Sequence, residues 1–234
     1  MADNGIFAEH ADTYARMSVR SPPNTHYDRP AILRLAGDLA GKRVLELGCA
    51  AGVLTAQLVE RGADVLALDR EPRLVELARE RMGDRARVEV ADLERPLDVA
   101  SESVDVVVAS LVLHFLADWA PILGELRRCL APGGALVFSV HHPITGWLLS
   151  DRTDYHRTEL IDEEWDWSGQ RVTARMYRRP LSAIFGALRA AGFAIDVVDE
   201  PRPTPDAAVD PDLFEILETK PVFLFVRALR SEVG

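Results

Sequence analysis

The stretch of residues 43–52 constrains the fold of this chain more than any other. A short apolar run that begins at Val44 is followed by Glu46, Gly48 and Gly52, and a helical pattern begins directly after Gly52. This order predicts a strand, a ligand-binding loop and a helix. Glycines in such a loop accept positive φ and let a ligand approach the backbone, while the first N–H groups of the helix remain unpaired.

The spacing of the two glycines argues against a dinucleotide ligand. The loop reads Gly-x-x-x-Gly, and Ala50 stands where a dinucleotide fingerprint has its second glycine. That glycine is the one that lets a pyrophosphate lie against the backbone. We therefore expect a ligand that has no pyrophosphate.

Two further short strands end on carboxylates. Residues 64–69 end at Asp69, and 69 minus 48 places it 21 residues after Gly48, the separation typical of an acidic side chain that binds ribose hydroxyls. Residues 88–93 form the third strand, with Asp92 near its end. Helical patterns separate the three strands. Right-handed crossovers then predict a parallel sheet with helices on both faces and a ligand site at the carboxyl ends of the strands.

These three elements, in this order, resemble the class I S-adenosylmethionine-dependent methyltransferases, in particular the methyltransferase type 11 group. The resemblance runs from about Val44 to Phe138 and continues more weakly to the C-terminus. It implies S-adenosylmethionine as cofactor and S-adenosylhomocysteine as product, with the glycine loop at the methionine part, Asp69 on the ribose and Asp92 on the adenine amine. We expect the cofactor-binding residues to come from this loop, the strand ends and the N-terminal region: Tyr14, Glu46, Gly48, Cys49, Ala50, Gly52, Asp69, Arg70, Asp92, Leu93 and Ser110.

The rest of the chain completes an α/β fold. Further strands are expected at residues 104–109, 135–140, 193–199 and 222–229, with a turn at 131–134. Too few residues precede the last strand for a helical crossover, so it is expected to enter antiparallel. The prediction is a doubly wound, mostly parallel, Rossmann-like sheet of seven strands. It forms one methyltransferase domain, residues 41–234, in a chain that is a single domain overall.

Residues 1–40 are expected to form two helical pieces, separated by a break at residues 21–25 where consecutive prolines exclude a helix interior. The family resemblance implies that this segment is a helical lid over the cofactor and the substrate. Tyr27 and Arg29 are expected substrate contacts. The alternative is that they are only a packing aromatic residue and a solvated cation.

Residues 144–179 are expected to form a substrate-cap insertion. Alternating side chains on both sides of a turn at residues 168–170 predict a β-hairpin that places Trp165 and Trp167 on one face. These tryptophans either fix the hairpin onto the sheet or form aromatic walls around a planar acceptor. Both, together with Tyr177, are expected substrate contacts.

Three histidines are expected at the carboxyl edge of the sheet, His114, His141 and His142. Adjacent side chains of an extended segment point to opposite faces, so His141 and His142 cannot both reach one site. An imidazole titrates near neutrality and can accept a proton from the acceptor. His141 is the first choice for a catalytic base and His114 the second, the alternative for His114 being a pocket wall; His142 is retained as a substrate contact. Neither cysteine lies near them in sequence, so no metal site is expected.

Composition narrows the choice of partners. The chain has 234 residues and a formal net charge of −10, so nucleic acid is not expected as the acceptor, despite a local basic group of Arg175, Arg178 and Arg179. Two cysteines and an N-terminus without an apolar leader indicate a cytoplasmic location. The longest apolar run, residues 104–116, is too short to span a membrane, and no membrane partner is expected. We expect a monomer or a homodimer.

The leading hypothesis for function is methyl transfer from S-adenosylmethionine to an oxygen, nitrogen or carbon atom of a small molecule, such as an aromatic or secondary-metabolite-like compound. In this reaction the protein aligns donor and acceptor and removes the water between them, so it needs no nucleophile or metal of its own. An NAD(P)-dependent oxidoreductase on the same fold is the alternative, disfavoured by Ala50 and Asp92. A non-catalytic cofactor-binding protein is the third hypothesis, since a fold does not determine a function.

Overall fold

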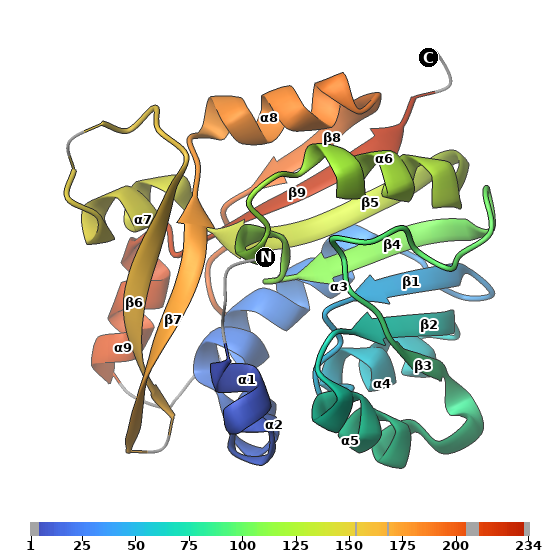
Figure 1. The fold of residues 1–234 in the computed structure, drawn as a ribbon, viewed down its shortest axis with the longest axis horizontal. Helices are drawn as coiled ribbons and strands as arrows, with labels where there is room; N and C mark the ends of the chain where they lie inside the picture. The colour runs from blue at the N-terminus through green and yellow to red at the C-terminus, as the bar shows by residue number, and fades with distance from the viewer. Residues whose placement is uncertain (1–4, 153, 168, 205–210, 232–234) are drawn as a thin grey trace.

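A central sheet organises the molecule. The computed structural model describes residues 5–152, 154–167, 169–204 and 211–231, and within them seven strands lie in the order β3-β2-β1-β4-β5-β9-β8 (Figure 1). They are β1 (Arg43–Leu47), β2 (Asp64–Asp69), β3 (Arg87–Val90), β4 (Val104–Ser110), β5 (Leu130–His141), β8 (Phe193–Asp199) and β9 (Phe223–Arg230). The strands β1 to β5 pair in parallel, whereas β9 is antiparallel to both of its neighbours, β5 and β8. The predicted α/β sheet with its antiparallel last strand is confirmed.

Helices cover both faces of this sheet. On one face pack α3 (Arg29–Ala36), α4 (Val53–Glu60) and α5 (Pro72–Met82), and on the other pack α6 (Ala120–Cys129) and α8 (Leu181–Ala190). Side chains along a strand alternate between the two cores, so that Val44 of β1 joins the first and Leu45 the second. Burial on both sides explains why the strands are almost continuously apolar. Outside these layers lie the short elements η2 (Gly83–Arg85), η3 (Leu113–Phe115) and α9 (Pro211–Thr219).

The turn predicted at residues 131–134 is a bulge inside β5. Val104 of β4 pairs with Leu130, and the next pair in the register joins Val106 to Ala135. Both ends of the predicted turn therefore pair with the same neighbouring strand, and β5 runs through it. A bulge of this kind adds residues to one strand without ending the pairing.

The N-terminal segment is more continuously helical than predicted. The helices α1 (Ile6–Glu9) and α2 (Ala11–Arg20) are followed by a π-helical segment, η1 (Pro23–Asp28), which runs directly into α3. The break predicted at residues 21–25 is narrower than expected: it is confined to Ser21, where ψ is 119° and α2 ends. The prolines stand at the start of the new helical segment, where their missing N–H groups would be unpaired in any case.

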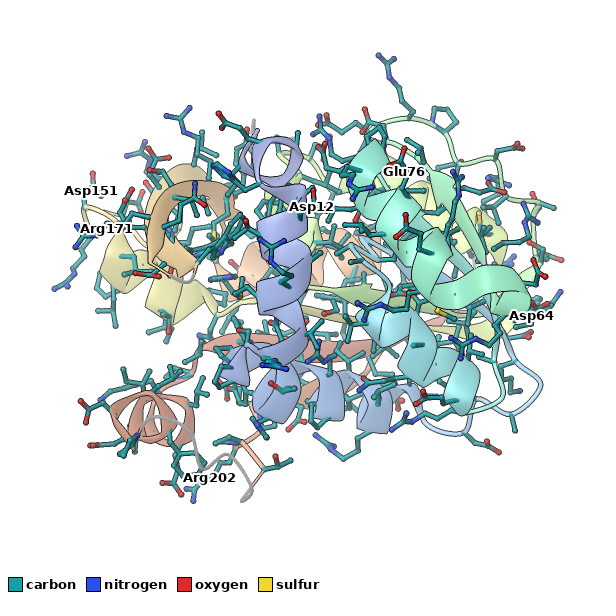
Figure 2. All side chains as sticks on the ribbon, turned by 90° about the horizontal axis from the view of Figure 1, so that it is seen from below. Asp12, Asp64, Glu76, Asp151, Arg171 and Arg202 are labelled. Carbon is teal, nitrogen blue, oxygen red and sulfur yellow. The ribbon has the colours of Figure 1, made fainter. Side chains whose placement is uncertain are left out.

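The helix α2 lies beside α5, as Figure 2 shows with Asp12 and Glu76 labelled on the two helices. Arg73 of α5 donates hydrogen bonds to Asp12 (2.8 Å) and to Glu76 (3.1 Å). Such exposed ion pairs contribute little stability. The buried contact is apolar, between Ala15 of α2 and Leu74 of α5. The N-terminal helices are thus packed onto the main domain.

A second sheet of two strands stands at the carboxyl edge of the main sheet (Figure 1). Its strands, β6 (Glu159–Trp167) and β7 (Gln170–Arg178), pair antiparallel with Trp167 opposite Gln170, which confirms the predicted hairpin. Ser168, part of the predicted turn, lies outside the described residues. The helix α7 (Pro143–Leu149) precedes the hairpin and packs against it.

The two faces of the hairpin differ in character, as the alternation predicted. The face turned toward the sheet edge is buried or half-buried except at Gln170, beside the turn. It carries Glu159, Ile161, Glu163, Trp165, Trp167, Val172, Ala174, Met176 and Arg178. The opposite face is exposed along the paired stretch and carries Asp162, Glu164, Asp166, Arg171, Thr173 and Arg175. Trp165 and Trp167 therefore share a face, with ring centroids 6.2 Å apart.

Candidate functional site

A cavity of about 410 Å³ lies at the carboxyl ends of β1, β2 and β4, beneath α1, α2 and η1. This size suits a small-molecule ligand. The cavity wall includes the following predicted cofactor residues: Tyr14, Glu46, Gly48, Cys49, Ala50, Asp69, Arg70, Leu93 and Ser110. Gly52 and Asp92 do not line it. The strand ends thus meet at one cavity, as parallel strands require.

The glycine loop has the backbone that its composition predicted. Gly48 has φ 69°, and a Cβ built on it would lie 2.7 Å from a methyl carbon of Val112. No side chain fits there without displacing the neighbour, and positive φ adds strain for any L-residue. Gly52 (φ 74°) must be glycine for a different reason: a Cβ built on it would lie 3.2 Å from the backbone of Ala78. Gly52 serves the packing of α4 against α5 and is not part of the cavity wall, contrary to the predicted cofactor contact.

Asp69 connects the second strand to the glycine loop. One carboxylate oxygen accepts a hydrogen bond from the N–H of Ala50 (2.8 Å), and the other accepts from the N–H of Glu71 (3.0 Å). Burial raises the pKa of this carboxyl, and the hydrogen bonds oppose that rise. Each carboxylate oxygen has a second lone pair, so acceptor capacity remains for ligand hydroxyls. Asp92 accepts from the N–H of Glu94 (3.0 Å).

Glu46 is a second buried carboxyl in the cavity wall. Its Oε2 accepts a hydrogen bond from the hydroxyl of Thr55 (2.6 Å). Burial raises the pKa of Glu46 to about 7. The charge of this group at neutral pH is therefore sensitive to a cation placed beside it.

Asp28 is a third carboxyl in the wall, and sequence reasoning missed it. Its side chain is 1 % exposed and accepts hydrogen bonds from the hydroxyls of Ser110 (2.5 Å) and Ser139. Burial raises the pKa of Asp28 to about 6. Ser110 and Ser139 are paired in register on β4 and β5. Two serines at the cofactor end of neighbouring strands were the available signal for a polar partner from elsewhere in the chain.

Of the other contacts predicted for the N-terminal segment, two residues line the cavity and one does not. Tyr14 lines the cavity, and burial raises the pKa of its phenol to about 12. Tyr27 does not: it is buried against Phe223 and Phe225 in the core, so the predicted substrate contact is replaced by packing. Arg29 is buried rather than solvated. It donates to two carbonyls at the end of α2 and also lines the cavity.

The three histidines do not meet at one point. His114 and His141 lie together, with ring centroids 4.8 Å apart, and burial lowers the pKa of both. His142 points the other way, as predicted for adjacent residues. Its Nε2 lies 2.8 Å from Glu200, and its Nδ1 accepts from the N–H of Ile144 at the start of α7. His142 therefore caps a helix in place of the substrate contact predicted for it.

The hairpin brings aromatic residues to the N-terminal helices and to His141. Trp167 packs against Phe7 (5.7 Å between ring centroids) and Tyr14 (5.0 Å), so it holds the N-terminal helices. Trp165 is stacked on His141 at 6.1 Å. Tyr177 pairs with exposed Leu160 on the other face of the hairpin, so the structure does not bring it to these residues as a substrate contact.

The described residues contain no group of three or more His, Cys, Asp or Glu side chains arranged to hold a metal ion. Among them, no helix combines the length and the hydrophobicity that crossing a bilayer requires.

The chain resembles known methyltransferases in sequence. Residues 45–138 match the family model described as "Methyltransferase domain". The ribosomal RNA small subunit methyltransferase A of Anaeromyxobacter is 30% identical over 218 residues, covering 87% of this chain and 73% of that protein. Magnesium-protoporphyrin O-methyltransferase of Rhodobacter capsulatus is 37% identical over 120 residues, 50% of this chain and 52% of that protein. The match with this second relative thus spans about half the length of either protein.

The structure also resembles solved ones. An S-adenosylmethionine-dependent methyltransferase from Mesorhizobium loti superimposes with a TM-score of 0.71 at 28% identity, over 91% of this chain and all of that one. None of these likenesses supports the oxidoreductase alternative. The carboxylates at the cavity also suit a cofactor that carries a sulfonium and an ammonium charge. The chain belongs to the class I S-adenosylmethionine-dependent methyltransferases.

Proposed function

We propose that this protein transfers a methyl group from S-adenosylmethionine to a small-molecule acceptor bound between the cofactor cavity and the hairpin β6–β7. The observation that carries the proposal is the cavity itself, where the Gly48 loop and Asp69 form one wall and the N-terminal helices form the roof. When bound, S-adenosylmethionine supplies an activated methyl group. The protein's part is to orient the two reactants and to exclude water.

Five residues of the cavity wall have a role in this proposal. Asp69 accepts hydrogen bonds from the ribose hydroxyls while it holds the loop through Ala50. Gly48 leaves room for the methionine part of the cofactor. Asp28 and Glu46 face its positive charges, and Tyr14 closes the site from α2. Asp92 stays a predicted contact of the adenine amine, at the end of β3.

A small acceptor is supported by the Rhodobacter relative, whose name gives a porphyrin as its substrate. The second candidate is a nucleic acid, which the Anaeromyxobacter relative favours. The distribution of charge opposes it. Of the basic group predicted from sequence, Arg178 is buried and paired with Glu159 (2.7 Å), and Arg179 is buried over the ring of Trp119. A net charge of −10 also disfavours binding to phosphates.

Calorimetry and a transfer assay test the proposal. Calorimetry should show binding of S-adenosylmethionine and S-adenosylhomocysteine and none of NAD. Radiolabelled methyl from S-adenosylmethionine should then appear in a panel of small aromatic acceptors and not in 16S ribosomal RNA. If the label appears in the RNA and in none of the small molecules, the nucleic acid candidate replaces the small-molecule acceptor.

A further inference from the structure

The inner face of the hairpin β6–β7 carries two carboxylates: Glu159 is paired with buried Arg178, whereas Glu163 lies among apolar side chains. Glu163 lies between Ile161 and Trp165 on this face, opposite Ala174. The exposed charged side chains of the hairpin lie on its outer face. A carboxylate on an apolar, inward face is uncommon unless it has a partner, so its presence needs an explanation.

The side chain of Glu163 points to His141 at the sheet edge. Its Oε2 lies 3.5 Å from Nδ1 of His141 and is buried without a hydrogen bond. His114, 3 % exposed, lies beside His141, and neither of its ring nitrogens has a hydrogen-bond partner in the described part of the chain. Three buried polar atoms thus converge from η3 and β6 around His141 of β5. Native structures rarely contain buried polar groups without a partner unless the groups bind a ligand or act in catalysis.

The surroundings of this cluster are aromatic. Trp165 is stacked on the His141 ring with an interplanar angle of 16°, and Phe223 meets the same ring edge-on at 5.3 Å. Phe115 packs against His114 at 4.3 Å and also lines the cofactor cavity. One phenyl ring therefore joins the histidine cluster to the cavity. A planar acceptor that displaces or slides along this ring would reach both.

We propose that His114, His141 and Glu163 form the acceptor side of the site, where His141 takes the proton from a neutral, phenol-type hydroxyl and Glu163 is a positioning residue that holds the imidazole. This inference rests on the proposed function and adds the acceptor class and a residue from the cap. Glu163 faces Nδ1 at 3.5 Å and forms no hydrogen bond to it in the free protein. When the two groups close to hydrogen-bond distance in the complex with the acceptor, Nδ1–H donates to the carboxylate and Nε2 is left to accept the proton. The second histidine, His114, donates a hydrogen bond to the acceptor oxygen.

A lone pair of the acceptor oxygen forms a bond to the methyl carbon, and the carbon–sulfur bond breaks with its electron pair going to sulfur. The hydroxyl proton moves to Nε2 of His141. The imidazolium is stabilised by the charge of Glu163 and releases its proton to water after the products leave.

The charges around the cluster select a neutral acceptor. Burial lowers the pKa of His114 and of His141, so both rings are neutral at pH 7 and can accept a proton. The charge of Glu163 partly opposes the fall in the pKa of His141, whereas the charge of Arg179 adds to the fall in the pKa of His114. The carboxylate would repel an anionic acceptor. The aromatic walls favour a flat ring.

The test compares two glutamate-to-glutamine variants of the full chain, at neighbouring positions on opposite faces of the hairpin. Glu163→Gln keeps the size and an acceptor oxygen but removes the charge beside His141. Glu164→Gln is the matched control on the outer face, where Glu164 is exposed and accepts a hydrogen bond from Thr173. The acceptors are monocyclic phenols, each paired with the same ring carrying a methoxy group in place of the hydroxyl.

With phenols, Glu163→Gln should lower kcat about 10- to 100-fold, and His141→Gln about 10²- to 10⁴-fold. The dissociation constant for S-adenosylmethionine should stay within about twofold in both, and Glu164→Gln should behave as the parent protein. The methoxy compounds should accept no methyl group. The acid limb of the pH–kcat profile should move to lower pH in Glu163→Gln, because the imidazolium loses its counter-charge.

A second readout needs neither cofactor nor acceptor. In the NMR spectrum of the free protein, the pKa of His141 should be lower in Glu163→Gln than in the parent and unchanged in Glu164→Gln. Equal His141 titration in all three, or unchanged kcat in Glu163→Gln and His141→Gln, would overturn the inference. So would a parent protein that binds S-adenosylmethionine but methylates no phenol. A parent protein that does not bind S-adenosylmethionine would instead refute the proposed function.

Discussion

Replacing Asp28 by Asn should flatten the pH dependence of the protein's stability. The carboxyl is buried and bonded to two serine hydroxyls, and burial raises its pKa from 3.8 to about 6. Between these two values the folded protein holds a proton that the unfolded chain releases. The stability contributed by protonated Asp28 is therefore full below pH 3.8 and is lost as the pH rises through about 6.

The size of the effect follows from the two pKa values. The complete shift corresponds to about 3 kcal/mol at 1.36 kcal/mol for each pH unit. Between pH 7.5 and pH 5, the linkage relation gives a gain of about 1.4 kcal/mol from this group. For a chain of this length that is about 3–6 °C in Tm. Asn has a similar shape but no ionisation, and its amide can bond to one serine while its oxygen accepts from the other.

Urea unfolding of the cofactor-free protein at about pH 7.5 and pH 5 measures this directly. Glu46 and Asp69 also have raised pKa values, but they are common to the parent and to Asp28→Asn, so their contributions cancel in the difference. Asp84→Asn, at an exposed site in η2, controls for the loss of one charge. If Asp28→Asn and the parent gain the same stability on acidification, Asp28 does not titrate in this window and the burial argument fails.

Three further predictions concern the cofactor cavity. Asp69→Ala should weaken binding of S-adenosylmethionine by about 2–3 kcal/mol in calorimetry, whereas Asp64→Asn, at the other end of β2 and labelled in Figure 2, should bind normally. Gly48→Ala should lower both the stability of the protein and its affinity for S-adenosylmethionine. Gly83 also has positive φ, but no atom lies within 4 Å of a Cβ built on it, so Gly83→Ala should lose only about 1 kcal/mol in urea unfolding and keep its affinity for the cofactor. Trp167→Leu should raise the dissociation constant for S-adenosylmethionine several-fold and speed amide exchange in α2, because Trp167 packs on the N-terminal helices. Unchanged exchange in α2 would show that the hairpin does not stabilise these helices.

The sequence alone determined the layout of the main domain. Its short apolar runs, the glycines and the acids at the run ends are local patterns with a known period, so they predicted the strands, the loop at Gly48 and the place of Asp69. The same period of two predicted that Trp165 and Trp167 share a face of the hairpin. Chain length between elements predicted the antiparallel entry of β9, which the pairing of β9 with β5 confirms.

Only the tertiary structure decided which side chains meet. Asp28 reaches serines 82 and 111 residues away, and Glu163 reaches His141 across the cap. Tyr27 became a core residue and His142 a helix cap for the same reason: burial and partner choice are set by packing between distant elements, and no local pattern records them. Elements follow from short-range periodicity, whereas the contents of the site depend on long-range contacts that exist only once the sheet, the lid and the hairpin have come together.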